Sequence, residues 1–126
     1  MVHSPRMDTR IARRLMQKKK RLDAYRPLPP FTVERLHEDL RVLLTYHSNA
    51  IEGNTLSLAE TQMVFAYGMT VNGHPLREFL EATNHAQAFD ALTRLATNPI
   101  TGDTVLILHR LVMDKIMRAM GPLAYQ

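Results

Sequence analysis

Glu52 is the residue of this chain whose placement points most directly to chemistry. It follows a helical pattern, because the stretch from Val33 to Tyr46 carries leucines at spacings of three and four residues. Gly53 comes next, and a glycine at this place is typical of a helix end. A carboxylate there lies at the negative end of the helix dipole, which gives its charge no stabilisation. The sequence therefore predicts that Glu52 is either simply exposed or held for a cationic partner, in this fold or on another chain.

Several separated blocks of the chain resemble the N-terminal half of Fic (filamentation induced by cAMP) proteins. Ser48-x-x-x-Glu52-Gly53 is similar to the inhibitory motif of that family, (S/T)xxxE(G/N). The resemblance extends roughly from Leu22 to Ile116 and includes further blocks in the family's order: Arg26–Pro30, Tyr46–Thr61, Gly73–Glu78 and Glu81–Ala86. Ordered blocks are more specific than one short motif, so a partial Fic fold is expected.

The resemblance implies an inhibitory role for Glu52. In Fic proteins the matching glutamate pairs with the second arginine of the catalytic signature, which otherwise holds the γ-phosphate of ATP. A guanidinium can bind a carboxylate or a phosphate through two parallel hydrogen bonds, so the two groups compete. The alternative is an ordinary surface glutamate at a turn.

The neighbours of Glu52 complete the predicted inhibitory motif. Ser48 lies one turn earlier, so its hydroxyl can orient the carboxylate, bond to a helix carbonyl, or be only a polar residue at the helix end. Gly53 and Asn54 both tolerate the left-handed backbone conformation by which a chain leaves a helix. We therefore expect backbone roles for these two residues.

The segment Thr70, Val71, Asn72, Gly73 and His74 is predicted to form a short β-hairpin, because an Asn-Gly pair stands beside a β-branched pair. It resembles the Fic flap, which lies over the active site and pairs with the target segment as an added strand. The family usually has lysine where this chain has His74, which leaves a charge-dependent role of that position open. The alternative is an ordinary turn between two helices.

The active-site signature of the family, HxFx(D/E)GNGRxxR, is not present in these 126 residues, and none of the six histidines begins it. No catalytic residue is therefore predicted, and residues 27–126 are interpreted as a Fic inhibitory and flap region truncated before the catalytic core. The expected function is autoinhibition of a protein adenylyltransferase through Glu52, in a chain that is inactive alone. Intact Fic enzymes transfer AMP from ATP to protein hydroxyls with Mg²⁺, whereas this chain alone is expected to bind no cofactor.

The partners that the resemblance implies are a Fic catalytic core, in cis or in trans, and through that core the protein target of AMPylation. A chain acting in trans would resemble a separately encoded antitoxin. A second copy of this chain is another expected partner, because apolar surface left by a missing half favours self-association. A non-functional remnant is an alternative interpretation, since Met117–Gln126 does not resemble the family's continuation.

Positive charge is concentrated in residues 1–26, which are predicted to be a basic N-terminal helix. This segment has nine Lys or Arg residues against Asp8 and Asp23, a formal +7, while the remaining hundred residues have seven basic and ten acidic residues, a formal −3. A solvated helix is the simpler interpretation. A basic module binding nucleic acid or protein is the alternative, and it predicts salt-sensitive binding. Because no aromatic interleaving or nucleic-acid motif supports it, nucleic acid is not an expected partner.

Start and stop signals predict an all-α fold of about five helices with the one short hairpin. Capping boxes or N-caps stand at Thr32, Ser57 and Thr101, and Pro75 suits the first turn of a helix. The expected helices cover residues 8–24, 32–50, 58–67, 75–97 and a fifth from 102 to about 116. The buried stripe expected of the fourth helix is Phe79, Ala82, Ala86, Phe89, Leu92 and Ala96.

Composition limits the remaining function classes. The chain has no cysteine, which excludes disulfides and thiolate metal sites, and its histidine spacings do not predict a metal centre. No apolar run approaches the length of a membrane span, and the first residues lack the apolar core of a signal peptide. A cytoplasmic protein without a membrane partner is expected.

Overall fold

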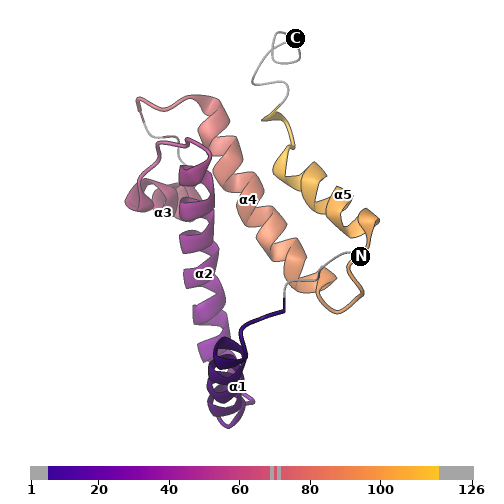
Figure 1. Ribbon diagram of the computed structural model, residues 1–126. Helices are drawn as coiled ribbons and strands as arrows, with labels where there is room; N and C mark the ends of the chain where they lie inside the picture. Colours follow the sequence, from indigo (N-terminus) through magenta and orange to yellow (C-terminus); the bar gives the residue numbers. More distant parts are fainter. Residues whose placement is uncertain (1–5, 69, 71, 117–126) are drawn as a thin grey trace. The chain divides into compact units, whose positions relative to one another are not determined.

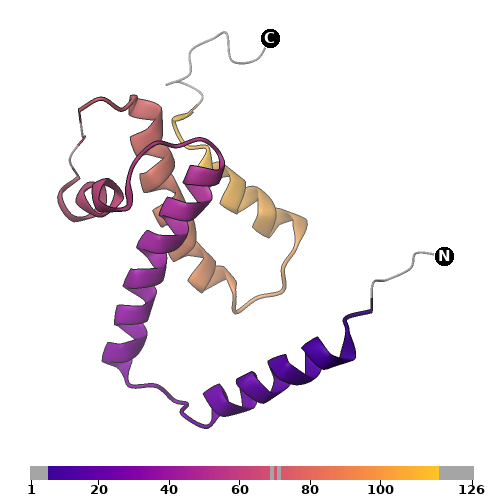
Figure 2. The same cartoon turned by 60° about the vertical axis from the view of Figure 1, so that its left-hand side comes forward.

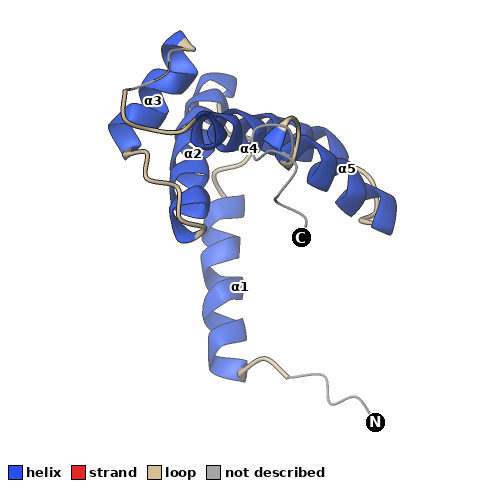
Figure 3. Ribbon diagram, turned by 90° about the horizontal axis from the view of Figure 1, so that it is seen from above, coloured by secondary structure: helices blue, strands red, loops and turns tan. Residues whose placement is uncertain are grey.

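A computed structural model describes residues 6–68, 70 and 72–116, which contain five helices and no strand (Figures 1 and 3). The predicted all-α class is therefore confirmed for the described residues. The chain divides into two compact units, residues 1–35 and 36–126. The helices are α1 (Thr9–Asp23), α2 (Pro30–Ile51), α3 (Leu58–Tyr67), α4 (Leu76–Leu95) and α5 (Gly102–Val112).

The predicted hairpin at Thr70–His74 is wrong as far as the structure describes it. Asn72 and Gly73 do form a turn, in which Gly73 has a φ of +91°. Neither Thr70 nor the residues after the turn are in a strand, and Val71 lies outside the described residues. A two-stranded hairpin is marginal without further strands or a packed face, and α4 begins only three residues after Gly73.

In the first unit, α1 is an exposed basic helix. Asp8 caps it, because its carboxylate accepts the Arg10 N–H at 2.8 Å. No residue of α1 is buried. Its last turn contains Lys20 and Arg21, which suit the negative end of the helix dipole. This exposure fits the solvated helix and the basic binding module equally well.

Helix α2 begins at Pro30, so the prediction that Thr32 caps it is wrong. Proline is well tolerated in the first turn of a helix, because its fixed φ suits the helix and its missing N–H would have no partner there. The first backbone bond at this end joins the Val33 N–H to the Pro29 carbonyl at 3.1 Å. The helix therefore starts two residues before the expected cap.

The capping predictions for α3 and α5 are confirmed. Ser57 and Glu60 exchange hydrogen bonds of 3.1 Å in a capping box, and Gly68 ends α3 with a φ of +62°. Thr101 caps α5 with a similar exchange with Thr104. These are short-range signals, so they could be identified from sequence spacing alone.

A small apolar core joins α3, α4 and the loop before α3. Its buried members are Leu56, Val64, Phe79 and Ala82, with Phe65 packed against them. In the predicted stripe of α4, Phe79, Ala82 and Ala86 are buried, but Leu92 is 45% exposed, and Ala96 is exposed as well.

Helix α4 has a second buried side, which the predicted stripe did not include. Ala88 and Ala91 are buried, and α5 runs beside α4 and returns toward its middle (Figure 2). Asn84 binds this return, since its amide donates to the carbonyls of Val112 and Asp114 at 3.1 and 2.7 Å. The predicted stripe covered a single face of α4, so it did not include Ala88 and Ala91, and at its C-terminal end it included Leu92 and Ala96, which are exposed.

Within the second unit, polar side chains connect α2 to α4. Arg41 binds Asp90 through two hydrogen bonds of 3.0 and 2.9 Å. One turn further along α2, the fully buried Thr45 hydroxyl lies 2.8 Å from Nδ1 of His85. Burial lowers the pKa of His85, which favours the neutral imidazole beside Thr45. These contacts fix the part of α2 that leads to Glu52.

None of the helices in the described part of the chain is both long enough and apolar enough to cross a membrane.

Candidate functional site

The exit of α2 at Glu52 and Gly53 is a well-formed Schellman turn. Gly53 has a φ of +95°, and its N–H binds the Ala50 carbonyl at 3.1 Å. The next N–H, that of Asn54, reaches back to the Asn49 carbonyl at 2.9 Å. These two bonds are the pair that defines the motif. The predicted backbone role of Gly53 is confirmed, and Glu52 is the last residue before the chain turns.

The Glu52 side chain is exposed at this turn. Its carboxylate makes no hydrogen bond or ion pair with any other residue that the structure describes. Ser48, in the last turn of α2, is partly exposed and its hydroxyl likewise has no partner among the described residues. The predicted inhibitory motif thus lies at the end of α2, where the Glu52 side chain is exposed.

Asn54 acts through its side chain, so the expectation that its role lies in the backbone is wrong. The residue is 8% exposed, and its amide donates to the Glu78 carbonyl at 3.1 Å and to Oε2 of Glu81 at 2.9 Å. Its Oδ1 accepts the Leu56 N–H at 3.0 Å, which forms an Asx turn. Asn54 does not have a positive φ, whereas Gly53 does. The glycine makes the turn, and the asparagine then ties it to α4.

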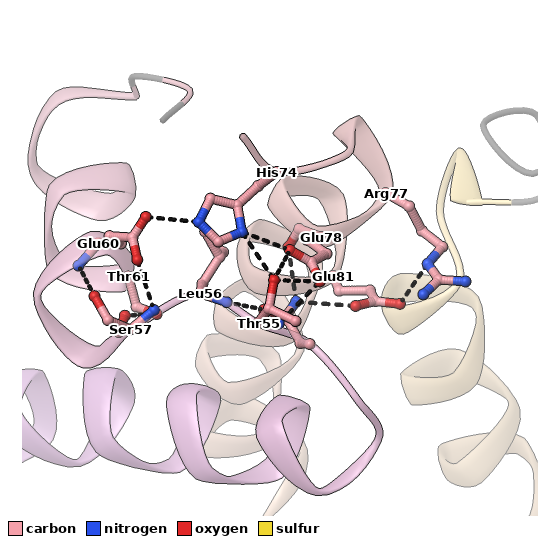
Figure 4. Close-up of polar contacts among 10 residues, drawn as sticks. Thr55, Leu56, Ser57, Glu60, Thr61, His74, Arg77, Glu78 and Glu81 are labelled. Atoms are coloured by element: carbon pink, nitrogen blue, oxygen red, sulfur yellow. Dashed lines mark hydrogen bonds and ion pairs between the residues drawn. The ribbon is translucent and has the colours of Figure 1, made fainter. Parts of the chain in front are cut away.

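Glu78 is the buried centre of the polar cluster drawn in Figure 4. Its side chain is 4% exposed. Oε1 accepts the Thr55 N–H at 2.9 Å, and the Thr55 hydroxyl lies 2.9–3.0 Å from both carboxylate oxygens. Sequence reasoning did not identify Glu78 as a site residue. A buried carboxylate is stable only when donors and positive charge surround it.

His74 supplies a further partner and connects the cluster to α3. Its Nδ1 lies 2.9 Å from Oε2 of Glu78, and its Nε2 lies 2.7 Å from Oε2 of Glu60 (Figure 4). The ring is 14% exposed. His74 was predicted to belong to a target-docking flap, but its imidazole is occupied by these intramolecular contacts. A docking role of Thr70, Asn72 and Gly73 stays a prediction.

The pKa values in this cluster shift in the directions that favour charge. Hydrogen bonding to Glu78 is the main reason that the pKa of His74 is raised, with burial opposing it and Glu60 adding to it. Burial raises the pKa of Glu78, but hydrogen bonds from Thr55 and His74 outweigh it and hold that pKa below its ordinary value. Bonds from the Ser57 backbone and side chain lower the pKa of Glu60.

In the described residues this arrangement is a network of hydrogen bonds and ion pairs and not a metal centre. No group of three histidine or acidic side chains in residues 6–68, 70 and 72–116 is placed to hold a metal ion. The acidic oxygens instead face hydrogen-bond donors. These contacts fix the loop 54–57, and thereby the end of α2 at Glu52.

Replacing Gly53 with alanine is expected to reduce the free energy of unfolding by about 1–2 kcal/mol, because an L-residue is strained in the left-handed region. No atom lies within 4 Å of an added Cβ, so crowding does not contribute. Urea denaturation of the chain measures this loss. Gly102→Ala is the control, since Gly102 also has free space but no positive φ. Equal stability of the two variants would contradict the Schellman turn.

The chain is similar to curated protein adenylyltransferases of three animals. It is 33% identical to "Protein adenylyltransferase fic-1" of Caenorhabditis elegans and to the protein of the same name in Caenorhabditis briggsae, over 64% of this chain. It is 30% identical to "Protein adenylyltransferase Fic" of Aedes aegypti over 67% of this chain. The aligned region spans 17% of the length of each of these relatives.

No family model matches the chain, and no solved structure matches it. The similarity to the adenylyltransferases therefore rests on the pairwise alignments, each of which covers about two thirds of the chain. The chain is related to the Fic family of protein adenylyltransferases.

Proposed function

We propose that this segment is the autoinhibitory N-terminal part of a Fic-type protein adenylyltransferase system. Its Glu52 would pair with the second arginine of a catalytic signature located in cis or in trans. The relatives are named protein adenylyltransferases, so the regulated reaction would be AMP transfer from ATP, with Mg²⁺, to a hydroxyl of a protein target. The 126 residues contain no such signature, and their contribution would be regulation.

The observation that carries this proposal is the exposure of Glu52 on a hydrogen-bonded turn. A carboxylate at a helix C-terminus gains nothing from the dipole, and Glu52 has no partner among the described residues to offset that. The turn that presents it is nevertheless fixed by Gly53 and by the buried side chain of Asn54. A fixed charge without a partner in the described part of the chain is suited to binding a cation outside this segment.

The inhibitory chemistry would be a competition for one guanidinium. Arginine binds carboxylate and phosphate with the same planar pair of N–H donors. While the arginine is paired with Glu52, it cannot hold the terminal phosphate of ATP, and the nucleotide loses its productive pose. A competition worth about 1.4 kcal/mol changes occupancy tenfold.

Exposed apolar side chains earlier on the same helix also support docking of a second body. Leu40, Leu43 and Leu44 of α2 are 47%, 40% and 43% exposed. Leucines exposed in a row are a surface that a partner would bury with a gain in free energy. The catalytic core that Glu52 would inhibit is the partner this proposal requires.

The test is auto-modification of a cognate Fic core mixed with this chain or with its Glu52→Ala form, followed with labelled ATP. Mixtures with Glu52→Ala are expected to show about tenfold more AMP incorporation, the equivalent of about 1.4 kcal/mol. Glu38→Ala is the matched control, because Glu38 is an exposed glutamate of the same helix. Equal incorporation with the unchanged chain and with Glu52→Ala would refute the proposal.

A further inference from the structure

The imidazole of His74 bridges two carboxylates that belong to different helices. Glu60 of α3 lies 2.7 Å from Nε2, and Glu78 of α4 lies 2.9 Å from Nδ1. The ring packs edge-on against the buried Phe79, with centroids 6.3 Å apart. The Thr55 hydroxyl is also 2.9 Å from Nδ1. His74 is thus the point at which the loop before α3, α3 itself and α4 meet.

This geometry favours the imidazolium form. A neutral imidazole carries one N–H, so one of its two nitrogens would present a lone pair to a carboxylate oxygen. The doubly protonated ring donates at both nitrogens and satisfies Glu60 and Glu78 together. The nearly buried Glu78 carboxylate also gains the positive charge that a desolvated anion needs.

The charged groups that face His74 are the two acids alone, as far as the structure describes its surroundings. Glu60 comes from α3 and Glu78 from α4. The next two charged residues on α4 pair with each other, because Nε of Arg77 lies 3.2 Å from Oε1 of Glu81. Glu81 also accepts a hydrogen bond from the Asn54 amide. No cation in the described residues competes with the ring for these two acids.

We propose that His74 is a proton-dependent latch that holds the loop 54–57 between α3 and α4, and so fixes the helix exit that presents Glu52. With the ring protonated, Glu60 and Glu78 are drawn to one group and Thr55 is held against Glu78. With the ring neutral, one carboxylate loses its donor and the loop is freed on that side. The latch is independent of the proposed function, although it would adjust the inhibition by Glu52 if that proposal holds.

The pH range of the latch follows from the directions of the pKa shifts. The raised pKa of His74 means that its stabilisation is complete below the ordinary value of 6.5 and is lost as the pH rises through the folded-state pKa. The lowered pKa values of Glu60 and Glu78 mean that their contribution is present above 4.5 and is lost as the pH falls through their folded-state values. The latch is therefore closed in mildly acidic solution and opens as the pH rises through the folded-state pKa of His74.

The first test follows the whole 126-residue chain by NMR between about pH 5 and pH 9, the range around an ordinary histidine pKa. The His74 ring is expected to titrate above 6.5. The protection factor of the Thr55 amide, which corrects for base-catalysed exchange, is expected to fall through the same midpoint. A midpoint at or below 6.5, or a Thr55 protection factor that does not change with pH, would overturn the proposal.

The second test uses variants with the same readout. His74→Lys keeps a cation that stays charged over this range, so Thr55 is expected to remain protected and to lose its dependence on pH. His74→Gln removes the charge and is expected to reduce protection at every pH. His109→Gln is the control, because His109 is an exposed histidine of α5, and it should match the unchanged chain.

The two tests remain decisive if one variant does not fold. Should His74→Gln be unfolded, the titration of the unchanged chain and the behaviour of His74→Lys still decide the question. A His74→Lys chain that keeps the original pH dependence would rule out His74 as the titrating group. Because no catalytic core is present, failure here would leave the proposed inhibition by Glu52 untouched, and failure of the inhibition test would leave the latch untouched.

Discussion

Phe79→Ala is expected to lower the free energy of unfolding by about 3–5 kcal/mol, the usual cost of removing a buried phenylalanine. Phe79 is 6% exposed and packs with Leu56, Val64 and Ala82 in the core that joins α3 to α4. It also contacts the His74 ring edge-on. The substitution therefore removes a buried phenylalanine from this core and also its edge-on contact with the His74 ring. Urea denaturation followed by far-UV circular dichroism measures the change.

Leu92→Ala is the matched control for Phe79→Ala. Both residues lie on α4 and both were predicted to be buried, but Leu92 is 45% exposed. Partial exposure leaves less apolar surface to lose, so a cost of about 1 kcal/mol or less is expected. Equal losses in the two variants would mean that the core does not lie where the structure places it.

The parts of the fold that could be predicted from the sequence are those fixed by neighbours along the chain. Ser57 with Glu60, and Thr101 as the cap of α5, are satisfied within three residues, so their spacing was sufficient. Gly53 and Gly68 end helices through positive φ, a conformation that few other residues adopt. Each of these features depends on residues that are close together in the sequence, so the local sequence is enough to predict it.

The parts of the candidate site that were missed depend on contacts between distant residues. Asn54 binds Glu78 and Glu81, which follow it by 24 and 27 residues, and nothing in its own neighbourhood indicates this. One signal was available for the latch: His74 and Glu78 are four residues apart, the spacing at which a histidine can pair with an acid across the start of a helix. Glu60 could not be added to that pair without the packing of α3 on α4.

The hairpin prediction is wrong because a turn signal does not by itself imply flanking strands. Asn72 and Gly73 supply the turn, and Gly73 has the positive φ that the pair indicates. Strands need a second partner or a packed face to be stable, whereas the chain after the turn is held by His74 and enters α4 at once. Local geometry was predicted correctly and the element built on it was not.

Asn54→Ala is expected to cost about 2–3 kcal/mol of stability, because it removes three hydrogen bonds and leaves the buried Leu56 N–H without its acceptor. The loss would be measured as a shift of the urea midpoint at unchanged slope. Asn98→Ala is the control, since Asn98 is an exposed asparagine in the loop before α5. A loss below about 0.5 kcal/mol for Asn54→Ala would place it among ordinary surface changes and contradict the anchoring role.

The same variant separates the position of Glu52 from its charge, an argument that rests on the proposed inhibition. Asn54→Ala leaves the carboxylate intact but releases the turn that presents it, so AMP incorporation by a mixed Fic core should rise toward the level seen with Glu52→Ala. Residues that act as one unit are not additive. The double variant Glu52→Ala, Asn54→Ala should therefore exceed neither single variant, because a displaced glutamate and a missing one free the same arginine. A double variant clearly more active than both would show that Asn54 acts on the core by a route other than Glu52.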